Sequence, residues 1–176
     1  MAVVSFVVII GNPRPGSRTA RAASAVAAAV AAAADVPGTP EIIDLADLAP
    51  HLLAADPPAA VAEATAKVAA ADVILVASPT YKGTYTGLLK VFLDRFGAGS
   101  LTGKAALPLL VLGAPQHALA VEVHLRPLLV ELGATVPTPG LALLEADLDR
   151  LDSLAKEWAA QIPPAVRGAL TAGAAR

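Results

Sequence analysis

The sequence predicts an α/β fold, a three-layer sandwich in which helices cover both faces of a five-stranded parallel sheet. Apolar segments rich in β-branched residues alternate with alanine-rich helical segments along the whole chain. This alternation is typical of βαβ units, whose crossover helices cover a parallel sheet. The first segment, Val3–Ile10, is continuously apolar, as expected for a strand that is buried on both faces. We expect the doubly wound strand order 2-1-3-4-5.

The other elements follow in chain order. The expected strands after the first are Glu41–Ile43, Asp72–Ala77, Ala105–Leu112 and a fifth strand that opens at Ala134–Pro137. The expected helices are Arg18–Ala34, Pro58–Ala70, a segment that follows Ser78–Gly83 and ends near Phe96, Gln116–Leu132 and Ala146–Ala160. Glycine and proline clusters separate these segments, which is typical of turns between regular elements.

Length and composition exclude several classes of protein. The chain has 176 residues and no internal repeat or linker, so we expect residues 1–176 to form one domain, with 163–176 as a mobile or interfacial tail. The absence of cysteine excludes disulfides, thiolate metal sites and cysteine nucleophiles. With 13 Lys and Arg against 15 Asp and Glu, the chain lacks the basic excess of a nucleic-acid-binding protein.

Two apolar stretches resemble targeting signals without meeting their requirements. Met1–Ile10 has no positively charged segment before its apolar run, and it leads directly into a turn rich in glycine and proline. The alanine-rich stretch 22–34 is too short to span a bilayer. We therefore expect a cytoplasmic protein with no membrane partner.

The loop after the first strand has the features of a phosphate site. It runs from Gly11 to Thr19 and enters the long helix, whose first amide groups are free to bind an anion. Ser17 and Thr19 add hydroxyls, and Arg18 adds a guanidinium group. The spacing is neither a Walker loop nor the dinucleotide fingerprint. The alternative is a capping turn in which Ser17 satisfies the start of the helix.

Two further loops follow the third and fourth strands, and ligands of open α/β sheets bind at such carboxyl ends. Ser78–Gly87 contains two tyrosines, several hydroxyls and a lysine, so Tyr81 would cover a planar ring whose polar edge meets backbone groups near Pro79 and Gly83. A turn and a helix cap with core contacts from Tyr85 explain the same residues. Gly113–His117 permits close approach of a flat ligand, and Gln116 or His117 would bond a carbonyl oxygen, unless His117 is a cap or surface residue.

Three segments resemble a known family. Gly11–Thr19 resembles the phosphate loop of the NADPH-dependent FMN reductases, which have a flavodoxin-like fold. Ser78–Lys90 is similar to the isoalloxazine-binding segment of that family, and His117–Leu129 resembles the helix after strand four in its sulfonate-utilisation branch. The likeness extends from about residue 3 to residue 145, which is most of the chain.

The resemblance implies FMN as cofactor and NADPH or NADH as reductant, with no metal and no catalytic side chain. Hydride transfer between a nicotinamide and flavin N5 depends on stacking and on exclusion of water rather than on acid–base groups. The implied cofactor-binding residues fall into three groups. Asn12, Arg14, Ser17, Arg18 and Thr19 form the phosphate loop; Pro79, Thr80, Tyr81 and Lys82, with Gly83, line the flavin and ribityl chain; Gly113 and Gln116 approach the ring from its far side.

The resemblance also implies an NAD(P)H-dependent FMN reductase that supplies reduced FMN to a partner flavin-dependent monooxygenase. Members are commonly homodimers or homotetramers that meet through the helices after strands three and four. Some members that feed a monooxygenase carry an extra tyrosine in the helix after strand four, where this chain has Glu122-Val123-His124. The alternatives are an FMN-bound NAD(P)H reductase of quinones, azo compounds or metal oxyanions, and a non-enzymatic flavodoxin-like electron carrier. The low aromatic content, 3%, favours an open flavin face and hence the enzyme.

Residues outside the three loops have simpler interpretations. The acids Asp44, Asp47 and Asp56 are scattered around a loop and are expected to be solvated rather than to bind metal. Trp158 is expected to pack against the sheet or a neighbouring subunit. Glu122 and Arg126 are spaced for an ion pair along one helix.

Overall fold

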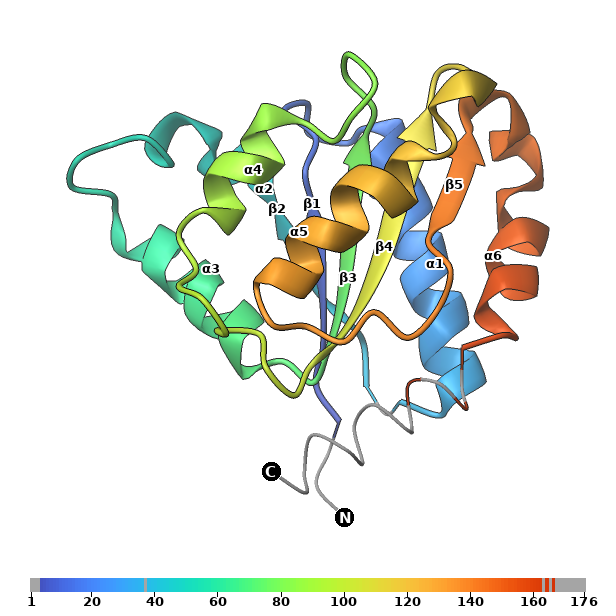
Figure 1. The fold of residues 1–176 in the computed structure, drawn as a ribbon, viewed down its shortest axis with the longest axis horizontal. Helices are drawn as coiled ribbons and strands as arrows, with labels where there is room; N and C mark the ends of the chain where they lie inside the picture. Colours follow the sequence, from blue (N-terminus) through green and yellow to red (C-terminus); the bar gives the residue numbers. More distant parts are fainter. Residues whose placement is uncertain (1–3, 37, 163, 165, 167–176) are drawn as a thin grey trace.

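A five-stranded parallel sheet forms the middle layer of the protein (Figure 1). The computed structural model describes residues 4–36, 38–162, 164 and 166, so most of the expected tail at 163–176 lies outside the described residues. The strand order is β2-β1-β3-β4-β5, which confirms the expected order. The strands are β1 (Phe6–Ile10), β2 (Glu41–Asp44), β3 (Val73–Pro79), β4 (Ala105–Leu112) and β5 (Leu141–Leu144). That residues 1–176 form one domain stays a prediction.

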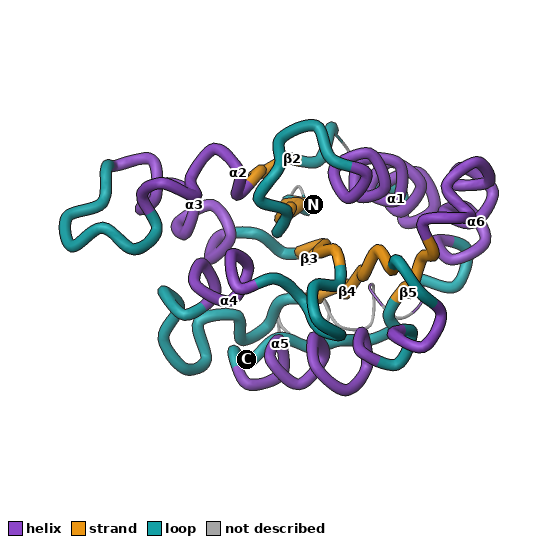
Figure 2. The backbone as a smooth tube through the Cα atoms, turned by 90° about the horizontal axis from the view of Figure 1, so that it is seen from above, coloured by secondary structure: helices purple, strands orange, loops and turns teal. Residues whose placement is uncertain are grey.

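Helices cover both faces of this sheet, as the view from above shows (Figure 2). On one face lie α1 (Arg18–Ala34) and α6 (Leu151–Ala159), and on the other lie α3 (Ala59–Ala70), α4 (Gly87–Leu93) and α5 (Arg126–Glu131). A short helix, α2 (Leu45–Leu48), follows β2 directly. None of the described helices is both long enough and apolar enough to cross a membrane.

The central strands are buried on both faces, as their continuous apolar sequences predict. Every residue of β1, β3 and β4 is buried. Alternate residues enter opposite layers, since Val7 and Ile9 pack with α3 and α4 while Val8 and Ile10 pack with α1 and α6. The buried alanines of α1 have no long side chains, so this helix lies close to the sheet and to α6. Because every strand pairing is parallel, the carboxyl ends of all five strands lie at one edge of the sheet.

The fifth strand begins later than the sequence predicts. Thr135 forms an isolated parallel bridge to Ala105, with its amide 2.9 Å from the carbonyl oxygen of Lys104, but the ladder stops there. The next residues include Pro137 and Pro139, which have no amide hydrogen to donate. The prediction that the strand opens at 134–137 was therefore wrong, and β5 proper begins at Leu141.

The helix expected at 116–132 is divided into three kinds of turn. A 3-10 turn, η2 (Pro115–His117), leads to a π-helical segment, η3 (Val121–Leu125), and only then to α5. In the π segment the amide of Arg126 donates to the carbonyl of Val121, five residues back. Pro127 follows immediately and cannot donate to a carbonyl four residues back, so a regular α-helical ladder is interrupted at this point.

An ion pair on this helix holds the segment that precedes β5. Glu122 pairs with Arg126, which confirms the expected spacing. The guanidinium group of Arg126 also donates to the carbonyl oxygens of Val136, at 2.8 Å, and Thr138, at 2.6 Å. The amide of Gly140 donates to Glu122. These bonds satisfy backbone groups that the two prolines leave without a strand partner.

The substitution Glu122→Gln should destabilise the protein in a pH-dependent manner. The hydrogen bond from Arg126 lowers the pKa of Glu122 below its ordinary value of 4.5. A lowered pKa stabilises the fold above the unfolded-state pKa, and this stabilisation is lost as pH falls through the folded-state value. Because the side chain is partly exposed, we expect a loss of about 1 kcal/mol at pH 7. Urea unfolding of both proteins from pH 7 to pH 3 should show the difference shrinking in acid, whereas a constant difference would contradict this account.

Candidate functional site

Hydrogen bonds within the loop between β1 and α1 hold its conformation. The side chain of Asn12 is buried, and its Oδ1 accepts from the amide of Arg14 at 3.0 Å while its Nδ2 donates to Oγ1 of Thr19 at 3.1 Å. Ser17 caps α1, accepting from the amide of Ala20 at 3.1 Å. The capping role expected as an alternative is therefore present. It leaves other first-turn amides without a partner inside the helix, so an anion site remains at this terminus.

A cavity of about 400 Å³ lies between this loop and the loop after β3. It is lined by Asn12, Arg14, Pro15, Gly16, Ser17, Arg18, Thr19, Pro79, Tyr81 and Glu145. The structure thus brings the predicted phosphate residues together with two residues predicted for the ring. A larger groove between α1 and α6 is lined by eight alanines, with Asp152 and Lys156 as its two charged residues, so it is mainly apolar. The smaller, polar cavity is the better candidate site.

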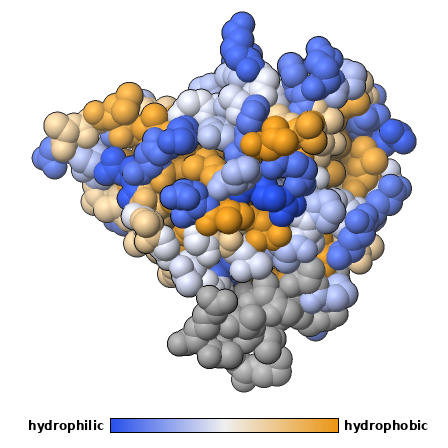
Figure 3. Space-filling view, in the orientation of Figure 1, coloured by the Kyte–Doolittle hydropathy of each residue, from blue (hydrophilic) through white to orange (hydrophobic). Residues whose placement is uncertain are grey.

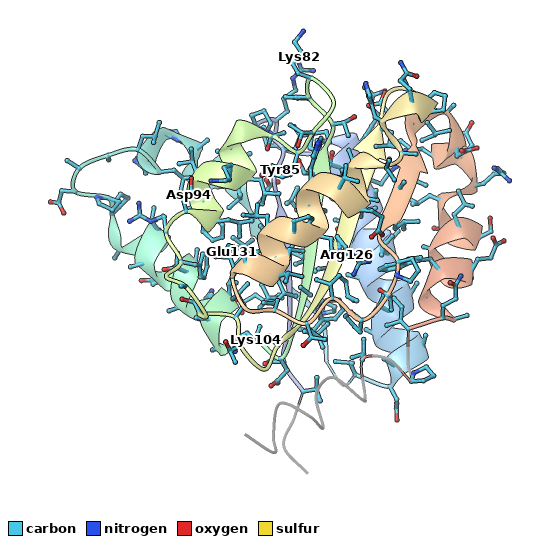
Figure 4. All side chains as sticks on the ribbon, viewed as in Figure 1. Lys82, Tyr85, Asp94, Lys104, Arg126 and Glu131 are labelled. Carbon is cyan, nitrogen blue, oxygen red and sulfur yellow. The ribbon has the colours of Figure 1, made fainter. Side chains whose placement is uncertain are left out.

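The loop after β3 projects from the sheet edge as a tight hairpin. The amide of Tyr81 donates to the carbonyl of Thr84 at 2.8 Å, and Lys82 and Gly83 both have positive φ, 55° and 81°. Two consecutive positive φ values indicate a type I′ turn, in which a lysine is strained relative to asparagine or glycine. Lys82 stands at the tip and points away from the rest of the molecule (Figure 4). Neither Lys82 nor Gly83 lines the cavity, whereas Tyr81 does.

Hydrogen bonds at Thr86 connect the first two loops. Its Oγ1 accepts from the amide of Leu89, which caps α4, and donates to the carbonyl of Gly11 at 2.6 Å. Its amide donates to Oγ of Ser78 at 3.0 Å. The turn-and-cap interpretation of this loop is therefore correct for Thr86, and the same cap holds the phosphate loop in place.

The loop after β4 presents open backbone and unsatisfied polar atoms. Gly113 is exposed, and a Cβ added there would meet nothing within 4 Å. Among the described residues, three side-chain atoms are buried without a hydrogen-bond partner: Oγ1 of Thr80, Nδ1 of His117 and Oγ1 of Thr138, the last of which lies in the segment before β5. Such atoms are costly unless a ligand or water satisfies them. Neither Thr80 nor His117 lines the cavity between the first two loops, and the exposed Gly113 and Gln116 do not line it either.

Glu145 is the cavity residue that the sequence analysis missed. It is the first residue after β5, and its Oε2 lies 2.8 Å from Nη1 of Arg18. The rule that ligands bind at the carboxyl ends of parallel strands would have singled it out. That signal was lost because the fifth strand was placed too early in the chain.

Residues outside the three loops have structural roles, although Asp44, which was expected to be solvated, is half-buried. Asp44 caps α2 by accepting from the amide of Ala46 at 3.0 Å. Trp158 is buried against the sheet and donates to the carbonyl of Pro139 at 3.1 Å. No three His, Asp or Glu side chains gather as a metal site within the described ranges.

An added methyl group should have very different effects on stability at two glycines of the strand-end loops. A Cβ on Gly11 would lie 2.7 Å from Cβ of Leu89, which cannot rotate away, so Gly11→Ala should destabilise the protein by about 2 kcal/mol. Gly113→Ala is the matched control, because its methyl group has open space, and we expect less than about 0.5 kcal/mol. Urea unfolding measures both values. Equal stability of the two variants would show that Gly11 is not needed for the close approach.

Comparison with known proteins identifies relatives over most of the chain. The family described as NADPH-dependent FMN reductase matches residues 4–149. An FMN reductase (NADPH) from Pseudomonas aeruginosa is 33% identical over 125 residues, which cover 69% of this chain and 67% of that protein. A shorter match, 43% identical over 70 residues, covers 40% of this chain and 37% of the FMN reductase (NADPH) from Escherichia coli.

Solved structures agree with these matches. The apo form of an NADH:FMN oxidoreductase (EMOB) superposes with a TM-score of 0.76 at 36% identity, covering 90% of this chain and 89% of that one. Two flavodoxins, 17 and 18% identical, share the fold and show nothing beyond it. The expected flavodoxin-like fold is confirmed.

Proposed function

The chain belongs to the NADPH-dependent FMN reductase family, and we propose that it reduces FMN with NAD(P)H and supplies the reduced flavin to a flavin-dependent monooxygenase. Both FMN and a nicotinamide nucleotide are the substrates of this family of oxidoreductases. The observation that carries the proposal is the polar cavity at the carboxyl edge of the sheet, where the loop that leads into α1 faces Pro79 and Tyr81 of the loop after β3.

The residues present fit the parts of FMN. Ser17, Arg18 and Thr19 would hold the phosphate at the start of α1, where free amides and a guanidinium group favour negative charge. Pro79 and Tyr81, which line the same cavity, would lie against the flavin and its ribityl chain. When bound, FMN supplies a ring that accepts hydride from the nicotinamide. The protein would contribute binding and orientation.

An open site supports release of the flavin over permanent retention. Tyr81 is the one aromatic residue that lines the described cavity, and it is 44% exposed. A single exposed ring gives less shielding than a pair of aromatic residues stacked on the flavin. The helix that carries an extra tyrosine in some monooxygenase-linked members is here the π segment, with His124 exposed on it. Single π turns occur frequently at functional sites, which is consistent with a role in flavin exchange.

Anaerobic stopped-flow tests this function. The protein is mixed with stoichiometric FMN and excess NADPH, then separately with NADH, and the oxidised flavin band is followed before ultrafiltration. We expect rapid bleaching with reduced FMN in the filtrate, faster than in a control without protein. Bleaching with the flavin retained would favour the alternative, an FMN-bound reductase of quinones, azo compounds or metal oxyanions. No bleaching with either nucleotide would favour an electron carrier.

We also infer a homodimer or homotetramer that meets through the helical segments after β4. Leu119, Val123 and Val130 on these segments are 65, 49 and 54% exposed. Figure 3 shows apolar surface among hydrophilic surface on the face of the molecule that carries α5. Exposed apolar patches of this kind are typical of protein–protein contacts.

A cytoplasmic location of the protein stays a prediction.

Charge placed on this patch should dissociate the oligomer. Val123→Asp and Val130→Asp should each shift the mass in sedimentation velocity toward the monomer, because burying an unpaired carboxylate at the contact is unfavourable. Leu53→Asp is the matched control, since Leu53 is 84% exposed and lies outside the segments after β4. An unchanged mass for both test variants would place the contact elsewhere.

A further inference from the structure

An ion pair occupies the anion site itself. Arg18 is the first residue of α1, and Glu145 is the first residue of the 3-10 turn η4 (Glu145–Arg150) after β5. Their side chains meet at 2.8 Å, and both residues line the cavity. Arg18 is therefore already paired when a ligand phosphate reaches the site.

A carboxylate at this position opposes the binding of a phosphate. The helix terminus and the arginines favour an anion, whereas Glu145 both engages one guanidinium group and places negative charge beside the phosphate. A site with the highest possible affinity for phosphate would have no acidic residue at this position. The electrostatic cost falls only on ligands that carry a phosphate, because an uncharged flavin tail does not compete for Arg18.

We propose that Glu145 competes with the flavin phosphate for Arg18 and so limits the affinity for FMN without affecting the ring site. This inference rests on the proposed function, in which FMN is a substrate that must leave after reduction. Arg14 lines the same cavity and forms no ion pair within the described residues, so positive charge remains for the phosphate. Glu145 thus weakens phosphate binding and does not abolish it.

The neighbouring ion pair provides a matched control. Asp147 lies two residues beyond Glu145 on the same 3-10 turn and pairs with Arg150 at 2.8 Å. Neither Asp147 nor Arg150 lines the cavity. Asp147→Asn therefore makes the same change of net charge on the same element without touching the anion site.

Titration of flavin fluorescence tests the proposal, with FMN and riboflavin added separately to the wild type, Glu145→Gln and Asp147→Asn. We expect Glu145→Gln to lower the Kd for FMN about fivefold, as removal of one partly solvated charge implies. The Kd for riboflavin should stay within about twofold, which also shows that the ring site is folded. Asp147→Asn should leave both constants unchanged. Unchanged or weaker FMN binding by Glu145→Gln would overturn the proposal.

A second variant tests whether Glu145 acts through Arg18. Arg18→Ala should raise the Kd for FMN about tenfold, because a charge-assisted hydrogen bond is lost. In the Arg18→Ala variant, the further substitution Glu145→Gln should change the Kd for FMN by less than about twofold, because the guanidinium group for which Glu145 competes is absent. A full fivefold effect in that variant would contradict competition.

The failure of the proposed function and the failure of this inference are distinguishable. If the wild type fails to bind FMN or to oxidise NAD(P)H, the proposed function fails. If it does both and Glu145→Gln behaves as wild type, only the inference fails.

Discussion

The close approach of Gly11 to the start of α4 is the constraint on which the arrangement of the site depends. The carbonyl of Gly11 accepts from Thr86 at 2.6 Å, and its amide donates to the carbonyl of Ala77 at 2.7 Å. There is no room for a Cβ, because Leu89 lies against the position that it would take. The end of β1 and the end of β3 are thereby fixed to each other. The phosphate loop and the ring loop start from this junction, so their separation is set before a flavin binds.

A site that is preformed in this way binds without a large cost in conformational entropy. In the proposed function the flavin must leave after reduction, and the charges of the cavity would limit the affinity for it. Arg14 and Arg18 favour the phosphate, while Glu145 opposes it. Under this proposal, recognition of the ring and retention of the phosphate are separable.

The region between α5 and β5 shows how side chains replace a missing strand ladder. Pro137 and Pro139 have no amide to donate, so the chain leaves the sheet after Thr135. Arg126 and Glu122, which lie at the two ends of the π segment, bond the carbonyls and the amide that remain. The irregular helix after β4 and the delayed start of β5 are thus parts of one arrangement.

The sequence by itself determined the features that depend on short segments. Continuous apolar runs predict strands buried on both faces. The strand order, the boundaries of α1 and β4 and the positions of the three loops at the carboxyl ends of the strands were all expected from the alternating pattern. Only the tertiary structure decided which distant residues meet in those loops. Thr86 reaches Gly11, Glu145 reaches Arg18 and Lys82 points away from the cavity because the sheet brings the strand ends together at fixed spacing. Local propensity does not predict such contacts, because they arise from packing between elements that are far apart in the chain.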